Sequence, residues 1–193
     1  MPEFSKKLEM LLRSKKPISL KALTDSFVEK SFAIVLLLLL ALPALPLPTG
    51  GITHIFEIIA MLVCVELIAG RKTLWLPNKW LNSTIPRSLQ KSALPKFIKI
   101  IKWFEKHSRP RLTRLQSHNL NIRIEGAIML LFIIFAFLAP PFSGLDTLPS
   151  LGVLVLSLSL IFDDYLLAIA GIAIGSIGIG LILTLGDLAF RLL

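Results

Sequence analysis

Charged residues are scarce in this sequence, and it has a single cysteine. Charged side chains make up 17% of its 193 residues, whereas hydrophobic residues make up 54%. Soluble domains are usually about 45 to 50% apolar, so this composition argues against a soluble domain and predicts an all-α integral membrane protein. Because Cys64 has no second cysteine to pair with, an internal disulfide is excluded. Its apolar surroundings indicate a small packing residue.

The common catalytic motifs are also absent from the sequence. It contains no Gly-Lys-Ser/Thr phosphate loop, no Gly-x-Ser-x-Gly elbow, no His-Glu-x-x-His helix and no cysteine–histidine metal cluster. Of its three histidines, His107 and His118 lie in a strongly basic segment. These absences argue against hydrolase and metalloenzyme chemistry. We therefore expect a non-enzymatic protein with no catalytic residue, no metal and no cofactor.

Long charge-free runs dominate what is present. Residues 31–47, 126–145 and 165–186 contain no charge, and their lengths approach the roughly 20 residues with which an α-helix crosses hydrocarbon. The first run follows residues 1–30, which are too long and too charged for the n-region of a signal peptide. We interpret it as a retained membrane segment preceded by a cytoplasmic lead-in helix, for which Ser19 is the expected N-cap.

Two Pro/Gly turns interrupt the apolar sequence, at residues 45–51 and 139–144. Laid over each other without a gap, they align Pro48 with Pro141, and the breaks that end the two copies also coincide. Proline lacks an amide donor and glycine exposes backbone, so each turn leaves polar groups that need partners inside a membrane protein. Any function is therefore expected where the two turns meet.

This alignment predicts two repeated helical hairpins, residues 31–70 and 124–162, within a single domain of residues 1–193. Before Pro43, the first helix is too short to cross a hydrocarbon core of about 30 Å at about 1.5 Å per residue. The hairpins therefore either span the membrane or re-enter it, and the sequence does not choose between these alternatives.

Positive charge is concentrated between the two hairpins. Residues 71–123 carry 13 Lys and Arg against a single Asp or Glu, and residues 1–31 carry 7 against 4. Lys and Arg cluster in cytoplasmic segments next to membrane helices. We therefore expect a multi-pass protein of the bacterial inner membrane with a cytoplasmic N-terminus. If every hairpin crosses fully, the C-terminus lies outside.

An amphipathic helix is predicted within this basic segment, at residues 94–107. Ile101 and Phe104 fall on its apolar face and the lysines on the other, a pattern typical of a helix lying on anionic lipid. Nucleic-acid binding is the competing interpretation, but no zinc-ligand spacing, recognition helix or aromatic RNA-binding motif accompanies the charge. We therefore expect membrane lipids, and no nucleic acid, as partners. The candidate headgroup-binding residues are Arg71, Lys99, Lys102, Lys106, Arg109 and Arg111.

Residues 163–193 predict a glycine-rich C-terminal transmembrane helix. Asp163 and Asp164 precede it, and N-capping of the helix explains such a pair better than metal binding does. Gly171-x-x-x-Gly175 forms a small-residue face that lets another helix approach closely. That helix belongs either to this chain or to a second subunit, so a homodimer is one possibility.

Glu57 is the most unusual polar residue in the apolar sequence. A carboxylate at this depth is costly and is usually paired or functional, and His54 lies one turn earlier on the same helical face. The alternative is that both residues cap the backbone of the adjacent turn. Glu66, nearer the end of its helix, is expected to reach Arg71 or Lys72. The candidate substrate-binding residues are Thr49, Gly50, Gly51, His54, Glu57, Ser143 and Gly144.

Several short motifs occur in a specific order along residues 20–186. They are Ser31-Phe32 before a leucine-rich helix, Pro46 to Gly51 with Glu57, Gly70-Arg71, Trp75-Leu76-Pro77, Ser108-Arg109-Pro110-Arg111, Leu148-Pro149 and the acidic break before the glycine-rich helix. In this order they resemble the ExoD family of bacterial membrane proteins linked to exopolysaccharide synthesis. The resemblance implies a role in making or exporting extracellular polysaccharide, and it implies no particular reaction.

Three hypotheses about function follow. The first is an inner-membrane factor that binds or moves a polar or lipid-linked substrate between the two turns, where broken helices expose backbone groups. The second is a scaffold that docks polysaccharide-synthesis proteins through its basic segment. The third is an intramembrane enzyme with Glu57 as general base.

Overall fold

The protein is all-helical in the part of the chain that the structure describes. This computed structural model describes residues 6, 9–10, 30–45, 52–71, 73–75, 77, 99, 101–106, 108, 119–140 and 143–191. The expected all-α class is confirmed for these residues. The principal helices are α3 (Ser31–Leu40), α4 (Ile52–Ile68), α8 (Asn119–Leu138), α9 (Thr147–Phe162) and α10 (Tyr165–Arg191).

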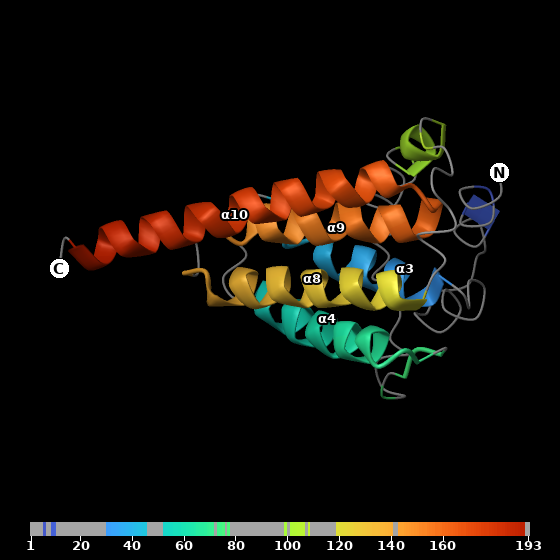
Figure 1. Ribbon diagram of the computed structural model, residues 1–193, viewed down its shortest axis with the longest axis horizontal. Helices are drawn as coiled ribbons and strands as arrows, with labels where there is room; N and C mark the ends of the chain where they lie inside the picture. The colour runs from blue at the N-terminus through green and yellow to red at the C-terminus, as the bar shows by residue number, and fades with distance from the viewer. Residues whose placement is uncertain are drawn as a thin grey trace.

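These helices lie side by side as an elongated, largely antiparallel bundle (Figure 1). Along it, α3 packs against α4 and α9, while α8 packs against α4, α9 and α10. At one end α3 and α8 finish and α4 and α9 begin; we call this the turn end. At the opposite end α4 and α9 finish and α10 begins; we call this the charged end, because Lys30, Glu66, Arg71 and Asp163 lie there.

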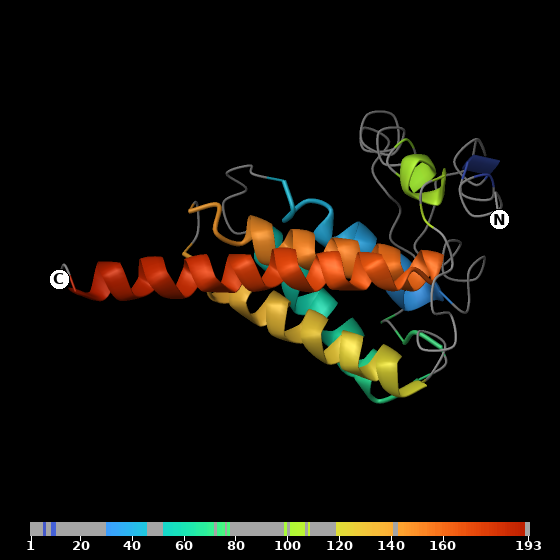
Figure 2. The ribbon, with the colours of Figure 1, turned by 45° about the horizontal axis from the view of Figure 1, so that its top comes forward.

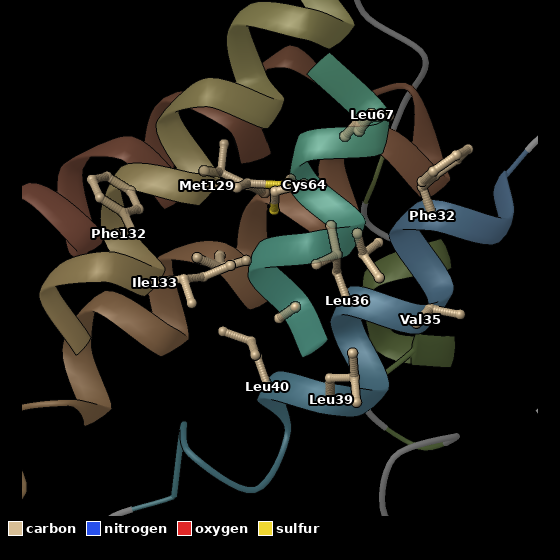
Figure 3. Packing of buried hydrophobic residues seen from close by; sticks show 14 of the residues in the cluster. Phe32, Val35, Leu36, Leu39, Leu40, Cys64, Leu67, Met129, Phe132 and Ile133 are labelled. Atoms are coloured by element: carbon tan, nitrogen blue, oxygen red, sulfur yellow. The ribbon is translucent and has the colours of Figure 1, made fainter. Parts of the chain in front are cut away.

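Large apolar side chains from α3, α4 and α8 meet inside the bundle (Figure 3). Leu36 and Leu40 of α3, Cys64 of α4, and Met129 and Ile133 of α8 are all fully buried. Burying a side chain of this size stabilises a fold by about 1.5 to 3 kcal/mol. The prediction that Cys64 is a packing residue is confirmed, because its thiol is free and buried in this cluster.

A second apolar cluster brings the central basic segment onto the bundle. Ile101 is only 2% exposed and packs with Ala33 and Ile34 of α3 and with Leu158 of α9. The prediction that the apolar face of this segment lies on lipid is therefore wrong at Ile101, where the contacts are with protein. The sequence pattern reports that a face is apolar, but it does not report which surface covers that face.

The two helices that finish at the charged end do so in the same way. Gly70, after α4, has φ +74°, and Asp163, after α9, has φ +54°. The next amides, of Arg71 and Asp164, each donate to the carbonyl oxygen five residues back at 3.2 Å. This is the Schellman arrangement, in which the residue after the helix takes the left-handed conformation. Gly70 therefore ends α4 in the conformation that glycine adopts most readily.

Glycines let α9 and α10 approach closely. A Cβ added to Gly152 would lie 2.7 Å from Cα of Gly175, and one added to Gly171 would lie 2.9 Å from the carbonyl oxygen of Gly152. Nearer the turn end, a Cβ on Gly178 would lie 2.6 Å from Cδ of Pro149. The small-residue face of α10 therefore meets a helix of this chain.

Among the described residues, two helices are long and apolar enough to cross a membrane by length and composition. They are Leu120–Leu138, within α8, and Tyr165–Leu188, within α10; Ser31–Leu40 and Thr147–Phe162 are apolar but shorter. Large apolar side chains project outward from α10, among them Ile169, Ile177 and Leu183. Beyond the turn end, α10 continues past the other helices (Figure 2).

Candidate functional site

The first turns of α4 carry a buried carboxyl group paired with a histidine. Nδ1 of His54 lies 2.9 Å from Oε2 of Glu57, and the Glu57 side chain is 0% exposed. The spacing of three residues along a helix places both side chains on one face. The His54 ring also packs against Phe137 of α8, with 5.1 Å between ring centroids. The expected partnership of His54 and Glu57 is confirmed.

Polar side chains also occur at the beginning of α9, at the same end of the bundle as this pair (Figure 1). The carboxyl group of Asp146 is near enough to act electrostatically on both His54 and Glu57. Thr147 begins α9, and Ser150 follows one turn later with a fully buried side chain. We call His54, Glu57, Asp146, Thr147 and Ser150 the turn-end polar cluster.

Several atoms of this cluster are buried and unpaired. In the described part of the chain, Oε1 of Glu57, Oγ1 of Thr147 and Oγ of Ser150 have no hydrogen-bond partner. The large majority of buried polar atoms in proteins are paired, and leaving one unpaired costs about 1 to 3 kcal/mol. A fourth unpaired atom, Oε1 of Glu105, lies in the central segment, so three of the four in the described part of the chain occur together at the turn end.

The cluster has donors as well as acceptors. Both α4 and α9 begin here, and the first amides of a helix lack intrahelical partners and carry the positive end of its dipole. The carboxyl oxygens and hydroxyls supply acceptors, and the hydroxyls and His54 supply donors. This combination can bind a polar group through several hydrogen bonds and can hold a proton between His54 and Glu57.

The second turn lies next to this cluster, and its Ser143 side chain already has hydrogen-bond partners. The Ser143 hydroxyl donates to the carbonyl oxygen of Pro140 at 2.6 Å and accepts from the amide of Leu145 at 3.2 Å. Gly144 takes φ +69°, and both Ser143 and Gly144 are exposed. The structure therefore places these two candidates at the surface of the turn end. Thr49, Gly50 and Gly51, of the first turn, lie outside the described residues.

The basic candidates are distributed along the charged end and the central segment. Nη1 of Arg71 lies 3.6 Å from Oε1 of Glu66, which confirms that Glu66 reaches this cation. Nζ of Lys102 lies 2.8 Å from Oε1 of Glu9. Lys99 and Lys106 are exposed. Arg109 and Arg111 lie outside the described residues, so headgroup binding by this set stays a prediction.

The two aspartates at the charged end have different roles. Oδ1 of Asp164 accepts from the amide of Leu166 at 3.1 Å, so the expected N-cap of α10 is confirmed at this residue. Its other carboxyl oxygen accepts from the Ser108 hydroxyl at 2.9 Å. Asp163 instead ends α9 and pairs with Nζ of Lys30 at 2.8 Å. Lys30 also donates to the carbonyl oxygen of Ile161, at the negative end of the α9 dipole.

Sequence reasoning missed Asp146, Thr147 and Ser150 as members of the site. In the gapless alignment of the two turns, Thr147 stands opposite His54 and Ser150 opposite Glu57. The second copy therefore repeats neither the histidine nor the carboxylate. The available signal was that polar residues occupy both aligned positions in otherwise apolar helices.

Comparison with known proteins places the chain in a family. A family model described as "Exopolysaccharide synthesis, ExoD" matches residues 4–184. The uncharacterized protein slr1875 of Synechocystis sp. is 32% identical over 155 residues, covering 80% of this chain and 72% of that protein. Protein ExoD of Rhizobium meliloti is 28% identical over 158 residues, covering 80% of this chain and 64% of that protein. No solved structure matches the chain. The resemblance indicated by the motifs is therefore confirmed, and the chain belongs to the ExoD family, which is associated with exopolysaccharide synthesis.

Proposed function

We propose that this chain is an integral protein of the bacterial inner membrane that acts in exopolysaccharide synthesis or export. In this proposal the turn-end polar cluster binds or moves a polar or lipid-linked substrate, and the protein itself catalyses no reaction. The observation that carries the proposal is the set of unpaired, buried polar atoms on Glu57, Thr147 and Ser150. The family and its ExoD relative support the pathway, and the cluster supports the location.

A buried hydroxyl without a partner is costly at a position where an apolar side chain would fit. An apolar residue of similar size at Ser150 would remove the cost of an unpaired buried hydroxyl, which is about 1 to 3 kcal/mol. The same bundle contains a buried serine without that cost, because the Ser157 hydroxyl donates to the carbonyl oxygen of Val153 at 2.9 Å. A hydroxyl that forgoes this local bond lacks a partner until a ligand supplies one, and the same holds for a carboxyl oxygen of Glu57.

The packing of the helices supports a site made by two hairpins. The aligned copies are α3 with α4 and α8 with α9, and α4 packs against α8 as α3 packs against α9. Exchanging one copy for the other preserves this pattern of contacts. The matching Schellman ends of α4 and α9 agree with it. In a repeated fold of this kind, polar substrates are bound where the two repeats meet.

The charged end indicates how the protein is oriented in the membrane. Lys30, Arg71 and Arg123 lie at or near this end of the bundle, and Lys102 lies in the segment that docks beside it. The positive-inside rule assigns such an end to the cytoplasm. We infer that the turn end faces away from the cytoplasm, so the polar cluster lies on the side toward which polysaccharide is exported.

The test of this proposal replaces residues of the two turns one at a time. The control replaces a residue whose buried hydroxyl is already hydrogen-bonded. Glu57→Gln and Ser150→Ala, and Thr49→Ala in the other turn, are expected to lower polysaccharide output. Ser157→Ala is the matched control, since it removes a buried hydroxyl from the same helix that is already bonded. Output is measured per amount of protein recovered in the membrane. Wild-type output from both Glu57→Gln and Ser150→Ala, at wild-type protein levels, would rule out the site.

A scaffold is the second candidate, and one observation favours it. Trp103 is 57% exposed and packs edge-to-face on Phe104, with exposed lysines on either side. The segment is held on the bundle by Ile101, so it presents this aromatic and basic surface in a fixed place. Charge reversal at Lys99, Lys102 and Lys106 together should then abolish polysaccharide output, while Ser150→Ala leaves it unchanged.

A further inference from the structure

We propose that, among the described helices, α10 alone crosses the full thickness of the bilayer and that the helices of both hairpins end inside it. The turn-end polar cluster then lies beneath the membrane surface opposite the charged end, which we call the far surface. Lipids of the far leaflet cover it. The inference rests on helix lengths and register, so it stands whether or not the cluster binds a substrate.

The register between α9 and α10 shows how far along α10 the helix α9 extends. Gly152 lies against Gly175, and three residues earlier in α9, Pro149 lies against Gly178, three residues later in α10. Two further steps in each direction bring Thr147, the first residue of α9, level with Gly180. The helix α9 therefore begins at about this level of α10.

The charge-free part of α10 is as long as the hydrocarbon core of a bilayer is thick. No charged residue occurs between Asp164 and Asp187, and at about 1.5 Å per residue this run measures about 33 Å. The hydrocarbon core of a bilayer is about 30 Å thick, so this run fits it. The part of α10 that is paired with α9, residues 165–180, measures only about 24 Å. The turn end therefore stops about 9 Å before the end of the apolar run.

The charged end fixes the near boundary of the membrane. The ion pair of Lys30 with Asp163 and that of Arg71 with Glu66 lie where α10 begins. Moving the protein until the turn end reached the far surface would draw these charges into hydrocarbon. It would also push the exposed side chains of Leu183 and Leu185 into water. Both changes are unfavourable, so α10 sets the position of the bundle.

The other helices agree with this placement. Both Ser31–Leu40 and Thr147–Phe162 are too short to span. The long helix α8 carries Arg123 and Glu125 near its beginning, so its charge-free part, residues 126–138, measures only about 20 Å. The distal part of α10 extends past all of them (Figure 2). Lipid of the far leaflet therefore covers the turn end, and a polar group carried on such a lipid reaches the cluster without leaving the membrane.

Depth measurements on spin-labelled protein test this placement. The purified full chain, with Cys64→Ala, is reconstituted into vesicles of phosphatidylethanolamine and phosphatidylglycerol. Single labels are placed in each hairpin, at Leu45→Cys and Ser143→Cys, and on α10, at Leu183→Cys and Asp187→Cys. Relaxation by oxygen, which partitions into hydrocarbon, is compared with relaxation by a water-soluble nickel chelate.

Labels at Leu45, Ser143 and Leu183 are expected to be relaxed mainly by oxygen, whereas Asp187 is relaxed severalfold more strongly by the nickel chelate. Nickel relaxation at both hairpin labels as strong as that at Asp187 would show that the hairpins reach water and would overturn the proposal. Nickel relaxation at Leu183 would overturn it as well. Leu45→Cys removes no side-chain hydrogen bond, so the test survives if Ser143→Cys disturbs its turn. These depths are independent of polysaccharide output, so failure of the proposed function and failure of this placement are distinguishable.

Discussion

Replacing Gly152 by alanine tests how α9 and α10 are held together. The added Cβ would lie 2.7 Å from Cα and 2.8 Å from the backbone nitrogen of Gly175. Carbon atoms in contact prefer a separation of about 3.5 to 4.0 Å. Because the opposing atoms belong to a helix backbone, they cannot rotate aside as a side chain does. The two helices must separate by about 1 Å near this point to restore that contact distance.

Two opposing effects set how much Gly152→Ala changes the free energy of unfolding. Overpacking of this kind costs about 1 to 3 kcal/mol. Alanine is a better helix former than glycine by up to about 1 kcal/mol, which offsets part of the cost. We therefore expect Gly152→Ala to lower the free energy of unfolding by about 1 to 2 kcal/mol. In a chain of this size that corresponds to a fall in Tm of about 2 to 8 °C.

A matched control lies in the same pair of helices. A Cβ at Gly180 would meet nothing within 4 Å, so Gly180→Ala gains helix propensity without a clash and should leave Tm unchanged or raise it. Both variants are melted in the same detergent and followed by circular dichroism. If Gly152→Ala melts at the same temperature as Gly180→Ala, the close approach of α9 and α10 does not hold and the register built on it is wrong.

Three further changes test other parts of the fold in the same melting assay. Asp164→Ala removes the N-cap of α10 and should cost about 1 to 2 kcal/mol, whereas Asp164→Asn keeps an acceptor oxygen and should cost less; equal melting temperatures would contradict the cap. Gly70→Ala forces alanine to φ +74°, where a side chain costs about 1 to 2 kcal/mol. The added Cβ would also meet the guanidinium of Arg123. An unchanged Tm would contradict this geometry. Ile101→Ala should lower the free energy of unfolding by about 2 to 5 kcal/mol because it empties a packed site. Trp103→Ala, at an exposed position, should lower it much less. The reverse order would mean that lipid, and not α3 and α9, covers the apolar face of this segment.

Local features of this protein could be predicted from the sequence because neighbouring residues determine them. Gly70 ends a helix and is followed by Arg71, so the C-cap and the approach of Glu66 to this cation follow from helix geometry. Asp164 precedes an apolar run and caps it for the same kind of reason. His54 and Glu57 meet because three residues bring them to one face of a helix.

Features that depend on distant parts of the chain could not be predicted in this way. The face that contains Ile101 is apolar whether it meets lipid or α3 and α9, so only the fold decides between them. A serine in an apolar helix usually donates to a carbonyl of the preceding turn, as Ser157 does, and is then unremarkable. The sequence does not reveal that Ser150 departs from this habit, because the departure is visible only in its surroundings.

Ser150 and Gly152 are near neighbours on α9, yet they should affect stability in opposite directions. Ser150→Ala removes a buried, unpaired hydroxyl, so the free energy of unfolding should stay level or rise by about 1 kcal/mol, while polysaccharide output falls. Gly152→Ala should lower stability, and any fall in output should follow the amount of folded protein. A residue retained for function at the expense of stability shows the first combination, and a residue retained for packing shows the second. If Ser150→Ala lowered Tm together with output, the hydroxyl would have a structural partner, and the turn-end polar cluster would lose the observation on which its assignment rests.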